Sequence, residues 1–284
     1  MNVLSLFDGI SCAKVALNRS NITVKNYYAS EIDKYTIEVS SKNHPDIKHI
    51  GNVKDISQLD INIDILIGGS PCQDLSVAKK NRKGLEGDRS SLFWEYVRIK
   101  NLCQPKWFIL ENVASMKKED KDTITKALGV KPIMIDASLV SAQSRKRLFW
   151  TNIPVVLPED RNIKLKDILI NNVANKYYIK GYTLTSNGKQ TGYIGYIGNS
   201  NAQANRVYNT DNKSVCLSAN GGGLGAKTGL YKIDDQVRRL TPIECERLQG
   251  LTDNYTEGIS DTQRYKCLGN AFNVDVISHI LRAI

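Results

Sequence analysis

The stretch Asp64-Ile-Leu-Ile-Gly-Gly-Ser-Pro-Cys-Gln-Asp-Leu-Ser76 decides how the rest of the chain is interpreted. Residues 65–67 form a short apolar run that predicts a buried strand, and the two glycines after it end that strand. The next turn carries Cys72 just beyond the carboxyl end of the strand, the edge where open α/β sheets bind ligands. A thiolate there can attack an electron-poor carbon, whereas an isolated cysteine is more often a buried structural thiol. The neighbouring sequence decides between these interpretations.

Length and composition restrict the classes of protein. A chain of 284 residues holds one large domain with an insertion, or two domains. It has 39 basic and 29 acidic residues, a net charge of +10 and a pI of about 9.2, which favours a polyanionic partner such as nucleic acid. The six cysteines include no C-x-x-C pair and lack closely spaced histidines, so we expect no metal site. The first residues lack a signal-peptide pattern and no apolar run reaches the roughly 18 residues of a membrane span, so we expect a cytoplasmic protein with no membrane partner.

The beginning of the chain predicts a nucleoside-binding unit. A strand over 3–7, a tight turn over 8–11, a helix through Leu17 and a strand over 27–30 follow one another, and Ser11 is expected to cap the helix. Glu31 comes about 20 residues after the turn, where a carboxylate accepts hydrogen bonds from ribose hydroxyls. The turn is not G-x-G-x-x-G, so we expect a single nucleoside-type cofactor, with a nicotinamide oxidoreductase as a remote alternative. A generic α/β turn without a ligand is the other alternative.

The alternation of helices and strands continues along the chain. Helices are predicted over 34–43, 90–104, 165–170, 241–249 and 274–281, and strands over 47–53, 107–110, 133–136 and 147–150. Pro242 is expected in the first turn of the 241–249 helix, and a turn at Gly269-Asn270 is expected before the last helix. Glu111 follows the 107–110 strand and should leave the sheet on the same edge as Cys72. A carboxylic acid there can share or donate a proton, although a capping or ion-paired glutamate is the alternative.

Two arginines stand at the beginning of the 147–150 strand, in Gln143-Ser-Arg-Lys-Arg147. If that strand begins near Arg145, the two-residue period puts Arg145 and Arg147 on one face. Two guanidinium groups so placed suit a carbonyl or a phosphate, and a basic edge strand is the alternative.

Two further segments have the composition of DNA-contacting regions. Residues 79–89 contain five basic side chains, two glycines and no apolar period, which predicts a loop facing phosphates, with an ordinary solvated loop as the alternative. Residues 176–236 are rich in Tyr, Asn, Gly, Ser and Thr and predict short strands and loops. We interpret them as a recognition insert whose polar side chains reach base edges or backbone.

Six short motifs, taken in order, resemble those of the DNA (cytosine-5) methyltransferases. They are Phe7-Asp8-Gly9, Gly69-Ser-Pro-Cys72, Glu111-Asn112-Val113, Gln143-x-Arg145-x-Arg147, Arg239-Leu-Thr-Pro-Ile-Glu-Cys-Glu-Arg-Leu-Gln-Gly250 and Gly269-Asn270-Ala271. The resemblance spans nearly the whole chain. Motif details lean toward the branch that includes the animal de novo enzymes, and the compact length suggests a bacterial or phage protein.

The resemblance implies an α/β fold: a Rossmann-like, S-adenosylmethionine-dependent methyltransferase sheet with a small, irregular target-recognition insert. It implies a catalytic and cofactor domain over 1–160, a target-recognition region over 161–236 and a returning segment over 237–284. The implied reaction is methyl transfer from S-adenosylmethionine to C5 of a flipped cytosine, with Cys72 as nucleophile, Glu111 as acid, and Arg145 and Arg147 on the base and its phosphate.

The resemblance also implies two sets of binding residues. The cofactor contacts are Phe7, Asp8, Gly9, Ile10, Ser11, Glu31, Ile32, Asn52, Val53, Gly69, Pro71, Leu92, Asn270, Ala271 and Phe272. The DNA contacts are Ser76, Lys79, Lys80, Arg82, Lys83, Arg89, Tyr193, Tyr196, Asn199, Gln203 and Arg206. No metal is implied.

The sequence departs from the family pattern at two positions. Ser11 stands where a second glycine is common, and Asn52 stands where an aspartate commonly meets the adenine, so we expect slightly altered cofactor contacts. The expected partner is double-stranded DNA. A cognate restriction endonuclease as a functional partner, protection of a phage genome and regulation of genes are alternative roles. An RNA cytosine methyltransferase and a catalytically silent DNA-binding relative are the alternatives.

Overall fold

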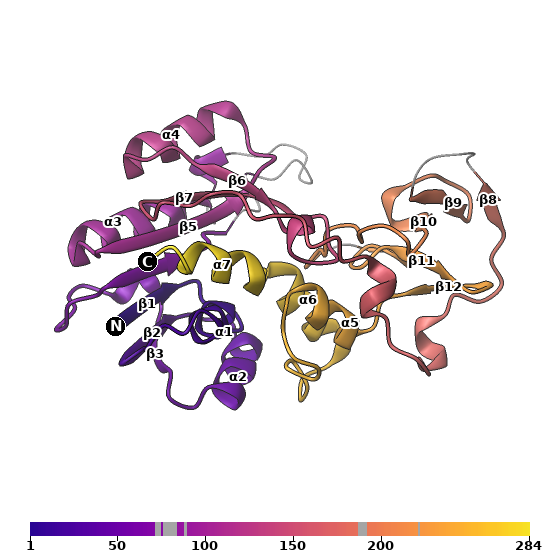
Figure 1. The fold of residues 1–284 in the computed structure, drawn as a ribbon, viewed down its shortest axis with the longest axis horizontal. Helices are drawn as coiled ribbons and strands as arrows, with labels where there is room; N and C mark the ends of the chain where they lie inside the picture. Colours follow the sequence, from indigo (N-terminus) through magenta and orange to yellow (C-terminus); the bar gives the residue numbers. More distant parts are fainter. Residues whose placement is uncertain (72–74, 76–83, 88–89, 187–191, 221) are drawn as a thin grey trace. The chain divides into compact units, whose positions relative to one another are not determined.

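The computed structural model of the chain describes residues 1–71, 75, 84–87, 90–186, 192–220 and 222–284 (Figure 1). The chain divides into two compact units. Unit 1 comprises 1–136, 146–157 and 276–284, and unit 2 comprises 137–145 and 158–275. Both ends of the chain therefore belong to unit 1. The functional division at 160 and 236 stays a prediction.

Unit 1 is built on a seven-stranded sheet of order β3-β2-β1-β4-β5-β7-β6. Its strands are β1 (Asn2–Leu6), β2 (Asn26–Ser30), β3 (Lys48–Gly51), β4 (Ile65–Gly68), β5 (Trp107–Val113), β6 (Ile133–Asp136) and β7 (Lys146–Thr151). The first five run parallel, and β7 is antiparallel to both β5 and β6. Every strand predicted for this region is present, because each is a short apolar run ended by Gly, Pro or a polar turn.

The helices of unit 1 agree with the sequence pattern except at two places. They are α1 (Cys12–Arg19), α2 (Lys34–Asn43), α3 (Phe93–Cys103), α4 (Lys118–Leu128) and α7 (Val274–Leu281), where α7 begins in unit 2, with short 3₁₀ turns at Val53–Asp55, Gly84–Glu86 and Ser90–Leu92. The predicted 90–104 helix thus begins as a 3₁₀ turn. Helix α4 was not predicted, because only Ile124 and Leu128 are buried among its many charged residues.

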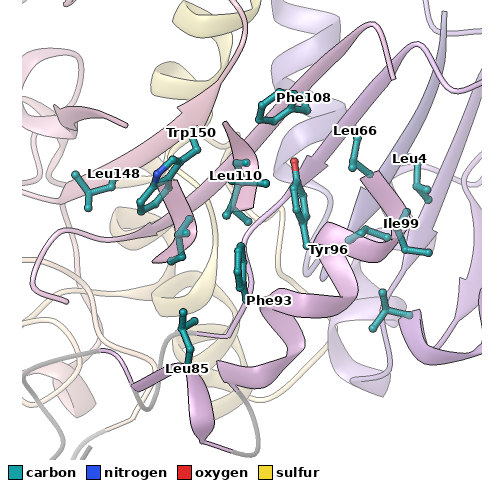
Figure 2. Close-up of a cluster of buried hydrophobic side chains, with 14 of the residues drawn as sticks. Leu4, Leu66, Leu85, Phe93, Tyr96, Ile99, Phe108, Leu110, Leu148 and Trp150 are labelled. Carbon is teal, nitrogen blue, oxygen red and sulfur yellow. The ribbon is translucent and has the colours of Figure 1, made fainter. Parts of the chain in front are cut away.

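One hydrophobic cluster joins α3 and α4 to the sheet, and Figure 2 shows its centre. Phe93 and Tyr96 of α3 pack with Leu66 of β4 and Leu110 of β5. A Cβ on Gly68 would lie 2.9 Å from the ring of Tyr96. The glycine that ends β4 is therefore required by the close approach of α3, a reason that only the packing reveals.

We expect Tyr96→Phe to stabilise the protein by about 1 kcal/mol, because a buried polar group without a partner costs free energy. The Tyr96 hydroxyl is fully buried and has no hydrogen-bond partner among the described residues. Urea denaturation of the two proteins measures the difference. Tyr265→Phe is the matched control, since the Tyr265 hydroxyl donates to the Leu240 carbonyl at 2.6 Å and its loss should destabilise. A loss of stability in Tyr96→Phe would contradict the prediction.

Unit 2 contains a five-stranded sheet of order β12-β11-β10-β9-β8. Its strands are β8 (Leu184–Ser186), β9 (Tyr193–Ile197), β10 (Arg206–Tyr208), β11 (Leu230–Ile233) and β12 (Gln236–Arg239), and its helices are α5 (Pro242–Leu248) and α6 (Asp261–Asn270). Short 3₁₀ turns occupy Ala137–Leu139, Leu165–Ile168, Asn175–Tyr177 and Gln203–Asn205. All strand pairs are antiparallel except β10 with β11. This confirms the prediction of short strands and loops.

Two expectations for unit 2 need correction. The segment predicted as a helix over 165–170 is a 3₁₀ turn over Leu165–Ile168. Gly269 and Asn270, expected in an open turn, form the end of α6. A Cβ on Gly269 would lie 2.3 Å from the backbone nitrogen of Ala219, so this glycine lets the end of α6 approach another backbone segment of the same unit.

A buried ion pair stabilises the junction of β12 with α5. Arg238 and Glu244 are almost fully buried and meet at 2.6 Å through two parallel hydrogen bonds. Thr241 and Glu244 form a capping box at the beginning of α5, and Pro242 occupies the first-turn position predicted for it.

Candidate active site

The predicted cofactor residues of unit 1 lie at one edge of its sheet. In the strand register Leu6 pairs with both Ser30 and Gly68, and Ser30 pairs with Gly51. The residues that follow these positions therefore leave the sheet at the same edge, the ligand-binding edge of an open α/β sheet. They are Phe7, Glu31, Asn52 and Gly69.

The turn after β1 has an unusual backbone. Phe7, Gly9 and Ser11 have φ angles of +57°, +61° and +60°. A Cβ built on Gly9 would meet nothing within 4 Å, so the described residues leave open space above this glycine. The Gly9 N–H donates to Glu31 Oε2 at 2.9 Å, and the other Glu31 oxygen accepts from the N–H of Ile32 at 2.7 Å. The acidic residue predicted to bind ribose therefore also holds the turn.

Asp8 is the buried carboxylate of this turn. It accepts hydrogen bonds from the hydroxyls of Tyr27 at 2.6 Å and Ser11 at 2.5 Å. Burial raises the pKa of the Asp8 carboxyl, and the hydrogen bonds from these hydroxyls oppose that shift. Ser11 precedes α1 as predicted, but its side chain makes no capping bond to the helix. Instead its hydroxyl bonds to Asp8 and, at 2.6 Å, to the hydroxyl of Ser40 on α2.

The apolar cofactor residues surround the same edge. Phe7 and Leu92 are partly buried against the cluster of Figure 2, to which Val53 also belongs, while Ile10 is fully buried. Ile32 is 71% exposed beside Glu31. Open space at Gly9, a carboxylate and an exposed apolar side chain fit the ribose and adenine of a nucleoside.

The side chain of Asn52 forms a hydrogen bond within its own turn at this edge. Its side-chain oxygen accepts from the Lys54 N–H at 3.1 Å and so caps the 3₁₀ turn after β3.

Glu111 lies inside β5 rather than after it, which corrects the expected end of that strand. β5 pairs with β4 as far as Leu110, and its other edge pairs with β7 as far as Val113. The antiparallel β7 extends the strand beyond the predicted end. Glu111 Oε1 and Arg147 Nε meet at 2.7 Å, and the two side chains are only 13% and 16% exposed. The structure therefore brings two of the predicted catalytic residues together.

Asn112 and Ser70 connect two of the motifs. The buried Asn112 amide donates to the Ser70 hydroxyl at 3.1 Å and to the Ser70 carbonyl at 3.3 Å. This bond joins the segment that carries Glu111 to the segment that ends in Cys72. Neither residue was singled out from the sequence, although both stand inside the quoted motifs. The signal available in the sequence was a polar Asn112 between Glu111 and the apolar Val113, at the end of an apolar run where a buried amide needs a partner.

Arg145 belongs to unit 2 and has different partners from Arg147. β7 begins at Lys146, so Arg145 precedes the strand. Its guanidinium donates to the carbonyls of Ala271 at 2.9 Å and Gly269 at 3.2 Å, and more distantly to that of Leu217. Arg145 thus holds the segment with Asn270, Ala271 and Phe272, of which Asn270 is exposed and the other two are buried.

The predicted DNA contacts divide into two groups. Ser76, Lys79, Lys80, Arg82, Lys83 and Arg89 lie outside the described residues, as does the predicted nucleophile Cys72. In unit 2, Tyr193 and Tyr196 lie on β9, Arg206 begins β10, and Asn199 and Gln203 are exposed between them. The Tyr193 hydroxyl and the Arg206 guanidinium both donate to the side chain of Asn201, at 2.6 and 3.1 Å, a residue not singled out from the sequence.

The described part of the chain adds two negative findings. It contains no group of three or more His, Cys, Asp and Glu side chains that could hold a metal ion. None of its helices combines the length and the apolar character needed to cross a membrane.

Comparison with known proteins identifies relatives along the whole chain. The family model "C-5 cytosine-specific DNA methylase" matches residues 1–284. The chain is 28% identical to the type II methyltransferase M.HhaI of Haemophilus parahaemolyticus, covering 99% of this chain and 93% of the relative. It is 30% identical to M1.ScrFI of Lactococcus lactis subsp. cremoris, with 98% and 76% covered.

Solved structures show the same fold. A mutant of Spodoptera frugiperda DNMT2 superposes with a TM-score of 0.73 at 18% identity, covering 99% of this chain and 98% of that one. Dnmt2 of S. pombe superposes with a TM-score of 0.70 at 18% identity, with 99% and 97% covered. The Rossmann-like α/β fold predicted from the sequence is confirmed.

The predicted activity is confirmed with it: methyl transfer from S-adenosylmethionine to C5 of cytosine in DNA. A match that runs from the first residue to the last also explains why the six motifs occur in one order along a single chain. This protein belongs to the C-5 cytosine-specific DNA methylase family.

Proposed function

We propose that Cys72, Glu111 and Arg147 carry out the reaction on a cytosine flipped out of duplex DNA. The observation that carries this proposal is the 2.7 Å ion pair of Glu111 and Arg147, linked through Asn112 to Ser70, two residues before Cys72. A carboxyl and a guanidinium this close match the adjacent N3 and O2 atoms of cytosine. The base leaves the stack at a cost of a few kcal/mol, which these contacts offset in part.

The proposed roles follow from the chemistry of each side chain. The Cys72 thiolate adds to C6 of the base, and Glu111 holds a proton at N3, so that electron density gathers at C5. Arg147 donates to O2 and orients the ring. S-adenosylmethionine, when bound, supplies the methyl group that C5 accepts. Loss of the C5 proton then allows the sulfur to leave C6, which restores the aromatic ring.

The cofactor residues are proposed on the edge of the unit 1 sheet. Glu31 accepts from the ribose hydroxyls and Gly9 leaves room for the nucleoside, while Phe7, Ile10, Ile32, Val53 and Leu92 supply apolar contacts. Asp8, Ser11, Asn52, Gly69 and Pro71 complete this set, and Asn270, Ala271 and Phe272 are its members in unit 2. Arg145 donates to the Gly269 and Ala271 carbonyls and would act by holding the 270–272 segment in place. Contact of Arg145 with the base or its phosphate stays a prediction.

The DNA-contacting surface is proposed on unit 2 and on the basic 79–89 segment. Tyr193 and Arg206 share Asn201 as acceptor, and Arg206 Cζ lies over the Tyr193 ring, 5.9 Å from its centroid. An arginine held by a neighbouring ring and amide is preorganised for a base edge or a phosphate. The net charge of +10 supports duplex DNA as the substrate.

We further propose a cytoplasmic enzyme that protects DNA against a cognate restriction endonuclease.

Bisulfite sequencing of DNA from cells that express the protein tests this proposal. We expect 5-methylcytosine in one short sequence context and none in cells that express Cys72→Ala. Transfer of tritiated methyl groups to duplex DNA and to tRNA in parallel separates the DNA reaction from the RNA alternative. Methylation of tRNA alone would overturn the DNA assignment.

Alkylation of thiols provides a second prediction. Burial raises the pKa of the Cys103 thiol to about 11. At pH 8 this leaves about 100-fold less thiolate than an ordinary thiol has, and the thiolate is the reactive form. We therefore expect iodoacetamide to modify Cys72 long before Cys103 in a time course followed by peptide mass spectrometry. Equal rates for the two cysteines would contradict the expectation.

A further inference from the structure

Ser11 is a non-glycine residue with a left-handed backbone in the turn after β1. Ser11 has a φ of +60°, a left-handed conformation that a side chain disfavours and a glycine adopts freely. A glycine would hold this backbone without help, whereas a serine needs other contacts to offset the strain. Its hydroxyl is fully buried and bonds to Asp8 at 2.5 Å and to Ser40 at 2.6 Å.

Asp8 is the centre of the cluster that holds Ser11. The carboxylate is 4% exposed and uses its two oxygens separately: one accepts from Ser11 and the other from Tyr27 at 2.6 Å. Tyr27 lies on β2, next to β1 in the sheet, and is itself 1% exposed. The Asp8 N–H donates to the Ser30 carbonyl at 3.2 Å. Asp8 is therefore anchored to β2 on two sides and can orient the Ser11 hydroxyl.

The same residues border the open space of the turn. Gly9 lies between Asp8 and Ile10, and its N–H donates to Glu31. Apart from Gly9 and these two neighbours, no described residue has an atom within 4 Å of the position a Cβ would take. The Ser11 N–H donates to the Asp8 carbonyl at 3.2 Å, which closes the turn around Gly9. If Ser11 left its left-handed conformation, this closure would open and Gly9 would shift.

We propose that Asp8 is a positioning residue for S-adenosylmethionine: through its bond to the Ser11 hydroxyl it holds Ser11 in a left-handed conformation that a glycine would adopt without help, and so keeps the turn open for the cofactor. This inference rests on the proposed cofactor role of residues 7–11. It predicts that the effect of Asp8 on cofactor affinity depends on which residue stands at position 11. Glycine at position 11 makes the carboxylate unnecessary, whereas alanine at position 11 keeps the conformational strain and removes the bond that offsets it.

The experiment measures the Kd of S-adenosylhomocysteine by calorimetry on the full chain. We expect Ser11→Gly to bind within about threefold of the unchanged protein and Ser11→Ala about tenfold more weakly, because only glycine adopts the turn without help. Asp8→Ala should also bind about tenfold more weakly, and Asp8→Ala combined with Ser11→Gly should recover to within about threefold. Ser20→Ala, at the other end of α1, is the matched control and should leave the Kd unchanged.

Kinetics give an independent readout. For Asp8→Ala the KM for S-adenosylmethionine should rise, while the KM for DNA and kcat at saturating cofactor stay the same. Equal affinities of Ser11→Ala and Ser11→Gly would overturn the proposal, as would a double variant that binds no better than Asp8→Ala. Should Asp8→Ala not fold, the two Ser11 variants still decide the question. If the unchanged protein did not bind S-adenosylhomocysteine, the proposed cofactor site itself would fail instead.

Discussion

Cys72→Ala is expected to lower methyl transfer by more than about 10³-fold while DNA binding persists, because the nucleophile starts the reaction but is not needed to hold the duplex. Without addition of sulfur to C6, C5 of an aromatic cytosine is a poor acceptor of a methyl group. The duplex is held chiefly by contacts to phosphates and base edges, which this substitution leaves in place.

Two measurements on the same preparation test this expectation. Tritium transfer from labelled S-adenosylmethionine reports the reaction, and a gel-shift titration at fixed salt reports DNA affinity. Cys103→Ala is the matched control, since it removes a thiol from α3 that has no proposed role. A fully active Cys72→Ala protein would end the assignment of the nucleophile. Loss of both activity and DNA binding would show that Cys72 supports the structure of the DNA site.

Glu111→Gln is expected to lower kcat by about 10²- to 10⁴-fold with little change in cofactor affinity. The amide has nearly the shape of the carboxyl but cannot pass a proton to N3. It also leaves the Arg147 guanidinium, 16% exposed, without the carboxylate that lies 2.7 Å away. A buried charge that loses its partner destabilises the folded state, so the variant should also unfold at a lower temperature.

A control separates these two effects of Glu111→Gln. Glu95→Gln on α3 removes the carboxylate of another 2.7 Å ion pair, formed with Arg98, and neither residue has a proposed part in binding the base. We expect Glu95→Gln to keep kcat. Single-turnover methylation at a temperature where all three proteins are folded measures the chemical step. A Glu111→Gln enzyme with an unchanged single-turnover rate would remove Glu111 from the mechanism.

The placement of the motifs at the ends of the strands could be predicted from the sequence. Each strand of the parallel sheet is a short apolar run followed by a glycine or a polar residue, and that pattern is local. Since parallel strands place their carboxyl ends at one edge, Phe7, Glu31 and Gly69 could be expected near one another without a structure. The register of β1 with β2 and β4 confirms that these three residues follow strand ends at the same edge of the sheet.

Other features depended on partners distant in sequence. Glu111 lies within a strand because β7 pairs with it, and β7 is more than thirty residues away. Helices α4 and α6 carry too few buried apolar residues for a clear period, so packing rather than pattern defines them. Tyr96 and Gly68 are matched in shape across α3 and β4, which no local rule anticipates.

The sequence by itself determined the fold class, the reaction family and the kinds of side chain that the reaction uses, because periodicity and short motifs are properties of neighbouring residues. The tertiary structure alone decided what each polar side chain contacts. It assigned Arg147 to Glu111 and Arg145 to the carbonyls of Gly269 and Ala271, and it turned Ser11 from an expected helix cap into the partner of a buried carboxylate. Hydrogen bonds and ion pairs form between groups that folding brings within about 3 Å, whatever their separation along the chain.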